Sequence, residues 1–173
     1  MQYELSEDDM RALLPGVRVV SYPELSSFSR IEDAMDQIGR VVILFLTTGL
    51  SQGHWITVHA NPNTHVMEFF DSYGLRPDGE RKWLSHSKLV ELHEKDATLT
   101  HMLDDANNRG WKVVYNPYHF QREDDDSETC GRHVAVRLLH GGIDIKRYKA
   151  LVSASRLTPD EFVLQQTRSV LGK

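Results

Sequence analysis

The sequence contains only one cysteine, Cys130, so no internal disulfide can form, and nothing in this usage points to an oxidising compartment. Long apolar runs are missing too, because the longest, Val41–Leu46, is far shorter than the roughly 20 residues that span a bilayer. Residues Met1–Met10 are acidic and lack the basic start and apolar middle of a signal peptide. These absences predict an intracellular protein without a membrane partner.

An excess of basic residues is also absent. The 20 Lys and Arg residues stand against 25 Asp and Glu residues, which gives a net charge of −5 and argues against a broad electrostatic grip on nucleic acid. The nine histidines show no zinc-ligand spacing with cysteine. We therefore expect no metal and no cofactor.

What is present fits an ordinary globular protein. The chain has 173 residues, of which 40% are hydrophobic and 26% charged, and it contains no repeat, low-complexity tract or linker. Helical and strand patterns are both present, so we expect one α+β domain over residues 1–173. Strands are predicted at Val17–Tyr22, Arg40–Thr48, His54–Ala60, Thr64–Phe70 and Trp111–Tyr115. Helices are predicted around Ser6–Leu14, Ile31–Ile38, Glu80–His93, Leu99–Ala106, Cys130–His140, Lys146–Ala154 and Thr158–Leu171.

Two of these strands form a predicted antiparallel hairpin. A turn centred between Pro62 and Asn63 places His54 directly opposite Asp71, at a separation that suits an imidazole–carboxylate hydrogen bond. Pro62 disfavours the primed two-residue turns, which require positive φ, so the loop can be wider. The hairpin therefore predicts a His–Asp pair.

Cys130 lies at the predicted start of a helix, where unpaired N–H groups and the helix dipole favour an anion such as a thiolate. Gly131 leaves space beside the sulfur for a substrate carbonyl. Gln121, upstream, carries an amide that can donate to an oxyanion together with the backbone N–H of Cys130. Each residue has a simpler explanation, such as a buried core cysteine or an Asp71 that caps a turn. The combination, with His54 as base, favours a nucleophilic site.

The flanking residues resemble a known family, the superfamily of the adenovirus endopeptidase (adenain) and the SUMO proteases. The resemblance covers about Val41 to Leu139 and is carried by Gly53-His54-Trp55, Phe69-Phe70-Asp71-Ser72-Tyr73-Gly74, Gln121 and Cys130-Gly131. The short interval between His54 and Asp71 resembles the viral maturation enzymes. The family implies a papain-like core of the adenain type, with a central, mostly antiparallel sheet flanked by helices and the nucleophile at a helix N-terminus.

The resemblance also implies roles. Cys130 would be the nucleophile, His54 the general base, Asp71 the residue that orients it and Gln121 the oxyanion donor. Substrate binding would involve Gly53, Trp55 and Gly131. One departure from the family is the longer stretch between Gln121 and Cys130, which includes the acidic cluster Glu123–Asp126. This cluster is either a solvated loop or a surface that attracts basic peptides.

The leading hypothesis is therefore a thiol protease that matures viral capsid or precursor proteins at Gly-containing sites. By resemblance it would act in the host cytoplasm or nucleus and could be packaged in a virion, with a peptide or nucleic acid as a candidate activator. Three alternatives remain open: a protease that removes ubiquitin or a ubiquitin-like modifier, an acetyltransferase with the same nucleophile, and a pseudoenzyme that only binds peptide.

Overall fold

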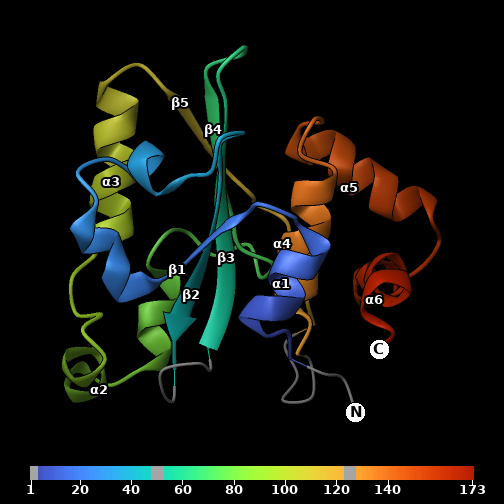
Figure 1. Ribbon diagram of the computed structural model, residues 1–173, viewed down its shortest axis with the longest axis horizontal. Helices are drawn as coiled ribbons and strands as arrows, with labels where there is room; N and C mark the ends of the chain where they lie inside the picture. The colour runs from blue at the N-terminus through green and yellow to red at the C-terminus, as the bar shows by residue number, and fades with distance from the viewer. Residues whose placement is uncertain (1–3, 48–52, 123–127) are drawn as a thin grey trace.

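The computed structural model describes residues 4–47, 53–122 and 128–173. Within these residues, five strands form one sheet in the order β1-β2-β3-β4-β5 (Figure 1). The strands are β1 (Arg18–Ser21), β2 (Arg40–Leu46), β3 (Gly53–Asn61), β4 (Val66–Phe70) and β5 (Lys112–Tyr115). The helices are α1 (Glu7–Leu13), α2 (His86–Glu91), α3 (Thr98–Asn108), α4 (Cys130–Leu139), α5 (Ile145–Ala154) and α6 (Pro159–Leu171), with short 3₁₀ helices η1 (Tyr22–Ser27), η2 (Ile31–Ala34) and η3 (Gly79–Trp83).

The sheet is mixed. The central pairs, β2 with β3 and β3 with β4, are antiparallel, whereas the outer pairs, β1 with β2 and β4 with β5, are parallel. The chain therefore has the expected α+β class with helices around a sheet, and the antiparallel expectation holds for the centre of that sheet and not for its edges.

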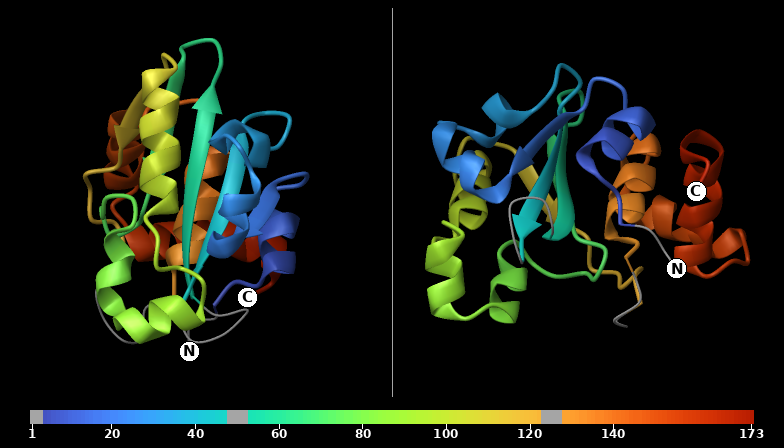
Figure 2. Two further views of the ribbon diagram at one scale, coloured as in Figure 1. Left: turned by 90° about the vertical axis from the view of Figure 1, so that its left-hand side faces the viewer. Right: turned by 60° about the horizontal axis from the view of Figure 1, so that its bottom comes forward.

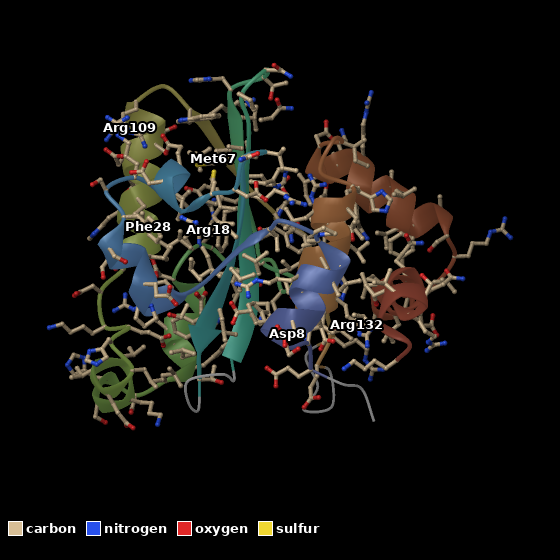
Figure 3. All side chains as sticks on the ribbon, in the orientation of Figure 1. Asp8, Arg18, Phe28, Met67, Arg109 and Arg132 are labelled. Atoms are coloured by element: carbon tan, nitrogen blue, oxygen red, sulfur yellow. The ribbon has the colours of Figure 1, made fainter. Side chains whose placement is uncertain are left out.

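Helices cover both faces of the sheet, which explains why β2 is apolar at almost every position. Alternate side chains of a strand point to opposite faces, and Val41, Ile43 and Phe45 enter the core beside η1, η2 and α3. Val42, Leu44 and Leu46 enter the second core, beside α1, α4, α5 and α6. The turned view shows α3 in front of the sheet and α4 behind it (Figure 2, left). In Figure 3, the labelled side chains of Met67 and Arg132 lie on opposite sides of the sheet.

Helix α4 lies in the interior between β3, α1 and α6. Every residue from Cys130 to Leu138 is buried, including three that can carry charge. Arg132 donates to Thr167 Oγ1 (2.5 Å) on α6, and Arg137 is paired with Glu68 on β4. Burying a charge is costly unless it is hydrogen-bonded and paired. The Arg137–Glu68 ion pair joins α4 to the sheet, and the Arg132–Thr167 hydrogen bond joins it to α6.

Two predicted helices are shorter than the sequence pattern indicates. The pattern over Ile31–Ile38 yields only η2, because Asp36 Oδ1 accepts hydrogen bonds from the backbone N–H groups of Ile38 (3.0 Å) and Arg40 (2.9 Å) and stabilises a loop instead. The pattern over Glu80–His93 divides into η3 and α2. Ser85 is the N-cap of α2 and accepts a hydrogen bond from Lys88 N, so a new helix begins there.

Candidate active site

The core of the site is an imidazole–carboxylate pair at the end of the sheet where β3 begins. His54 Nε2 lies 2.8 Å from Asp71 Oδ2, with 5% of His54 exposed and Asp71 fully buried. The other carboxylate oxygen, Oδ1, accepts a hydrogen bond of 2.7 Å from the backbone N–H of Tyr73. Asp71 therefore occupies Nε2 of the His54 ring, and the other ring nitrogen, Nδ1, is left for another partner.

The pair arises from a different hairpin register than the one expected. The ladder pairs Asn61 with Val66, so the turn occupies Pro62–His65 and is centred between Asn63 and Thr64. Proline cannot supply the positive φ of a primed turn, and here His65 provides it, with φ of 59°. The expected centre between Pro62 and Asn63 is thus wrong by one residue.

In the observed register, the residue directly opposite His54 differs from the expected one, but the side chains of His54 and Asp71 still lie on the same face of the sheet. Moving the turn centre by one residue changes the pairing by two positions, which is one full period of a strand. Continued past its last pair, the register sets Tyr73 opposite His54, and the two rings stack with centroids 5.3 Å apart. Asp71 reaches the imidazole diagonally from the position just after β4.

The third member, Cys130, is the first residue of α4 and is 7% exposed. Its thiol lies close enough to His54 to raise the pKa of the imidazole. Complete burial acts to lower the pKa of His54, but the charge and hydrogen bond of Asp71, with a further contribution from Cys130, raise it well above its usual value. A thiol, an imidazole and a carboxylate joined in series can move a proton off the sulfur.

Gln121 is brought to the same region through Ser72, the residue after Asp71. The Ser72 hydroxyl donates to Gln121 Oε1 (2.6 Å), and the backbone N–H of Gln121 donates to the Ser72 carbonyl (3.0 Å). Because Oε1 is held as an acceptor, the Nε2 end of the amide is the donor that points elsewhere. In the sequence, Ser72 belongs to the motif that follows β4, and its adjacency to Asp71 is the signal that could have identified this role.

The three residues expected to bind substrate make packing contacts, and their role in binding stays a prediction. A Cβ on Gly53 would lie 1.9 Å from the backbone oxygen of Phe45, so this position must be glycine for β3 to approach β2. Trp55 is 2% exposed and donates from Nε1 to the Leu5 carbonyl (3.1 Å). A Cβ on Gly131 would lie 2.9 Å from Trp55 Cδ1. These contacts position the start of α4 against the sheet.

Sequence reasoning missed an aromatic and acidic surround of His54. Trp83 meets the imidazole edge-on at 5.3 Å between centroids and is 43% exposed, and Tyr73 contacts both rings. Glu80 is fully buried nearby, and neither of its carboxyl oxygens has a hydrogen-bond partner in another described residue. Burial raises the pKa of Glu80 to about 7. The irregular 3₁₀ segment that carries Glu80 and Trp83 has no sequence pattern that marks it as part of a site.

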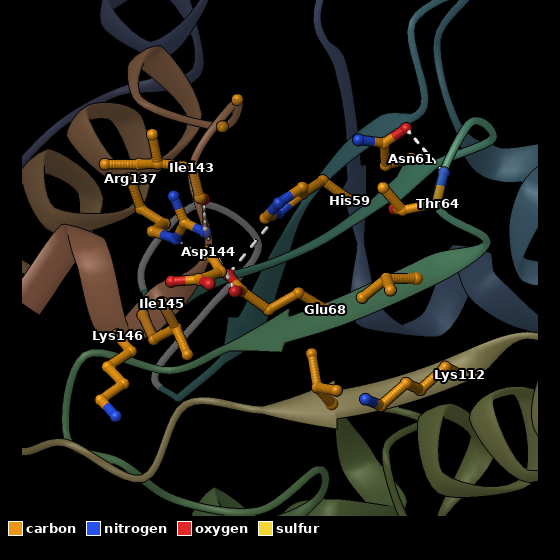
Figure 4. A pocket seen from close by; sticks show the side chains of 14 residues that line it. His59, Asn61, Thr64, Glu68, Lys112, Arg137, Ile143, Asp144, Ile145 and Lys146 are labelled. Atoms are coloured by element: carbon orange, nitrogen blue, oxygen red, sulfur yellow. Dashed lines mark hydrogen bonds and ion pairs between the residues drawn. The ribbon is translucent and has the colours of Figure 1, made fainter.

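The remaining sequence expectations concern other parts of the chain. The acidic cluster Glu123–Asp126 falls outside the described residues. A cavity of about 470 Å³ lies toward the turn end of the hairpin, lined among others by His59, Glu68 and Arg137 (Figure 4).

In the described part of the chain, no group of three His, Cys, Asp or Glu side chains could hold a metal ion. Over the same residues, no helix combines the length and apolar character needed to cross a bilayer.

Comparisons with known proteins give solved structures of low similarity. The central domain of the Legionella pneumophila protein Lpg1148 is 15% identical, with a TM-score of 0.43, over 99% of this chain and all of that one. The yeast SUMO protease Ulp1 in complex with Smt3 is 12% identical, with a TM-score of 0.37, over 92% of this chain and 74% of that one. At such scores these structural similarities support no conclusion about function. The functional argument rests on the site itself.

Sequence comparison is more decisive. No protein-family model matches the chain. "Uncharacterized protein V9" of Sputnik virophage is 31% identical over 174 aligned residues, which cover 94% of this chain and 93% of that protein. Such identity over nearly the full length of both proteins shows common descent. The chain therefore belongs to the family of the Sputnik virophage protein V9.

Proposed function

We propose that the chain is a cysteine peptidase in which Cys130 is the nucleophile, His54 the general base and Asp71 the residue that orients the base. The observation that carries this proposal is the buried hydrogen bond between His54 and Asp71, beside a Cys130 thiol that raises the pKa of the same imidazole. The nucleophile is placed at the N-terminus of a buried helix, where the helix dipole favours the thiolate.

The reaction takes place in two steps. The Cys130 sulfur bonds to a peptide carbonyl carbon, the C–N bond breaks, and the leaving amine takes a proton from the His54 imidazolium. Water then replaces the amine: His54 accepts a proton from it, its oxygen bonds to the carbonyl carbon, and the C–S bond breaks. The thiolate is regenerated, and no other reactant is required.

Gln121 is the proposed oxyanion donor, acting with the backbone N–H of Cys130. Its support is the Ser72 hydroxyl, which binds Oε1 and so determines that the Nε2 group faces away from Ser72. A donor that is fixed before the reaction stabilises the tetrahedral intermediate without reorganisation, and losing one such donor typically costs about a hundredfold in rate or more.

The proposed substrates are precursor proteins of a virus particle, cut at Gly-containing sites. Membership in a family with a virophage protein supports this choice over removal of a ubiquitin-like modifier. A single experiment separates the two. Purified protein is incubated with capsid precursors of its own virus and with a panel of ubiquitin-like conjugates, and new termini are mapped by mass spectrometry.

Variants test the chemistry in the same assay. Cys130→Ala and His54→Ala should each reduce cleavage by about a thousandfold or more, because nucleophile and base act as a unit. His101→Ala, at an exposed histidine on α3, is the matched control and should cleave at the unaltered rate. Cleavage retained by Cys130→Ala would rule out the proposed mechanism, and cleavage of modifier conjugates alone would replace the proposed substrate.

A further inference from the structure

One carboxylate outside the proposed triad contacts the chain on both sides of the segment that joins Gln121 to Cys130. Asp160, the second residue of α6, is 7% exposed. Its Oδ1 accepts from the Thr129 hydroxyl (2.5 Å) and lies 2.8 Å from His133 Nε2, while its Oδ2 accepts from the backbone N–H of Arg122 (3.2 Å).

The positions of these partners give the contact its significance. Arg122 directly follows Gln121, and Thr129 directly precedes Cys130. His133 lies one turn further along α4, on the same face as Cys130. A single side chain from α6 thus holds the residue next to the proposed oxyanion donor, the residue next to the proposed nucleophile, and the helix that carries the nucleophile.

Asp160 is ionised in this arrangement. Burial acts to raise its pKa, but the hydrogen bonds from His133, Thr129 and Arg122 lower it below the usual value. Burial lowers the pKa of His133, so the neutral ring donates its Nε2 proton to the carboxylate. Hydrogen bonds to an ionised acceptor are shorter and about twice as strong as neutral ones. The contacts of Asp160 with Arg122, Thr129 and His133 therefore hold these residues firmly in place.

The carboxylate is not needed to begin α6. That helix is capped by Thr158, whose hydroxyl accepts from Glu161 N (3.2 Å), while Glu161 Oε2 accepts from Thr158 N (2.9 Å). The Thr129 hydroxyl makes no capping hydrogen bond to α4, and it donates to Asp160. Both helix starts are therefore arranged so that Asp160 can bond to the segments beside Gln121 and Cys130.

We propose that Asp160 is a positioning residue that sets the separation between the Gln121 amide and the Cys130 sulfur, and so assembles the oxyanion hole of this enzyme. The inference rests on the proposed function, and it adds a residue from α6 that touches neither the substrate nor the reacting atoms. If the inference is right, loss of Asp160 slows reactions of Cys130 that pass through an oxyanion more than it slows reactions of the thiol that do not.

Two small reagents distinguish these reactions. With p-nitrophenyl acetate, the Cys130 sulfur bonds to the carbonyl carbon, an oxyanion forms, and p-nitrophenolate leaves. With iodoacetamide, the sulfur displaces iodide at a saturated carbon and no oxyanion forms. Asp160→Asn should slow acetylation of Cys130 about tenfold, a part of what loss of a whole donor costs, while alkylation changes less than about twofold. Rates are measured as the difference from Cys130→Ala.

The matched control is Glu161→Gln, at the next residue of the same helix. It weakens a cap of α6 without touching the residues beside Gln121 or Cys130, so it should lower the melting temperature and leave the ratio of the two rates unchanged. Thr129→Val removes one of the hydrogen bonds to Asp160 and should shift the ratio in the same direction, by less. This variant tests the proposal even if Asp160→Asn does not fold.

A double-mutant cycle with Gln121→Ala decides between positioning and simple loss of structure. If Asp160 acts through Gln121, Asp160→Asn should slow acetylation little when Gln121 is already absent. Additive losses, or equal losses of acetylation and alkylation, would overturn the inference. The proposed function itself fails in a different way, namely if Cys130→Ala or Gln121→Ala leaves acetylation at the wild-type rate.

Discussion

The imidazole of His54 is hydrogen-bonded to the buried carboxylate of Asp71, and the nearby thiol of Cys130 also raises its pKa. Tyr73 stacks on one ring face, and Trp83 meets the ring edge-on. The orientation of the ring is thus determined by contacts in several directions, which is what a base that must receive one particular proton requires.

A pH profile should show the effect of Asp71. Its charge raises the pKa of His54, so the imidazolium persists at pH values above the usual pKa of histidine. In Asp71→Asn the ring loses this charge and its pKa falls, so the alkaline limb of peptide cleavage, which needs the imidazolium to protonate the leaving amine, should move to lower pH. His101→Ala serves as control. An alkaline limb that stays in place would show that Asp71 does not hold the proton on His54.

Glu80 should make the protein less stable at high pH. Its pKa is about 7 in the folded protein, against 4.5 for the free side chain, so the folded state keeps a proton that the unfolded state releases between these values. The free energy of unfolding therefore falls as pH rises through this window. Glu80→Gln removes this loss and should stabilise the protein at pH near 8 by up to about 3 kcal/mol, with little effect near pH 4.

Urea unfolding at the two pH values measures this difference. Glu91→Gln is the control, because Glu91 has 67% of its side chain exposed and its replacement should change the unfolding free energy equally at both pH values. A Glu80→Gln variant with the wild-type pH dependence would contradict the assignment of a proton to Glu80.

At the scale of elements, the register of the hairpin shows what the sequence could predict. Two runs rich in β-branched and aromatic residues predict β3 and β4. His54 and Asp71 still share one face, because an error of one residue in the turn centre leaves the face unchanged. The contacts from Ser72 to Gln121 and from Asp160 to Thr129 could not be predicted. They join segments far apart in the chain, and no periodicity or turn chemistry specifies such contacts.

Glycines at two element contacts should tolerate alanine to different degrees. A Cβ at Gly53 meets the backbone oxygen of Phe45, which cannot move without breaking the pairing of β2 and β3. A Cβ at Gly131 meets Trp55 Cδ1 and Leu5 Cβ, which are side-chain atoms and not the backbone of a paired strand. Gly131→Ala should therefore cost about 1–3 kcal/mol, and Gly53→Ala more.

Thermal unfolding monitored by circular dichroism provides the measurement. Gly142→Ala is the control, since a Cβ there would have nothing within 4 Å, and its melting temperature should match that of the wild type. Equal melting temperatures for Gly53→Ala and Gly131→Ala would contradict the distinction between backbone and side-chain contacts.

For the whole molecule, a buried ion pair joins the sheet to the helical layer. Glu68 on β4 accepts from Arg137 Nε (2.9 Å) and Nη2 (3.0 Å), and Arg137 also donates to the carbonyls of His140 and Ile143 at the end of α4 and beyond (Figure 4). The bonds connect β4 to the C-terminal end of the helix that carries Cys130, so the far end of that helix is fixed as firmly as its start.

Breaking this pair should destabilise the whole fold. Arg137→Met leaves Glu68 charged and buried, which typically costs about 3–5 kcal/mol. Combining Arg137→Met with Glu68→Leu removes both charges and should recover much of that loss. Urea denaturation gives the unfolding free energies, and a double variant no more stable than Arg137→Met alone would show that the pair does not act as described.

Asp71 and Ser72 are consecutive residues, yet one contacts the imidazole and the other the amide of Gln121. Any displacement of the chain after β4 would therefore disturb both proton transfer by His54 and oxyanion binding by Gln121. Inserting one glycine between the two residues would separate these halves of the site, and natural relatives that vary in length here would have to rebuild both.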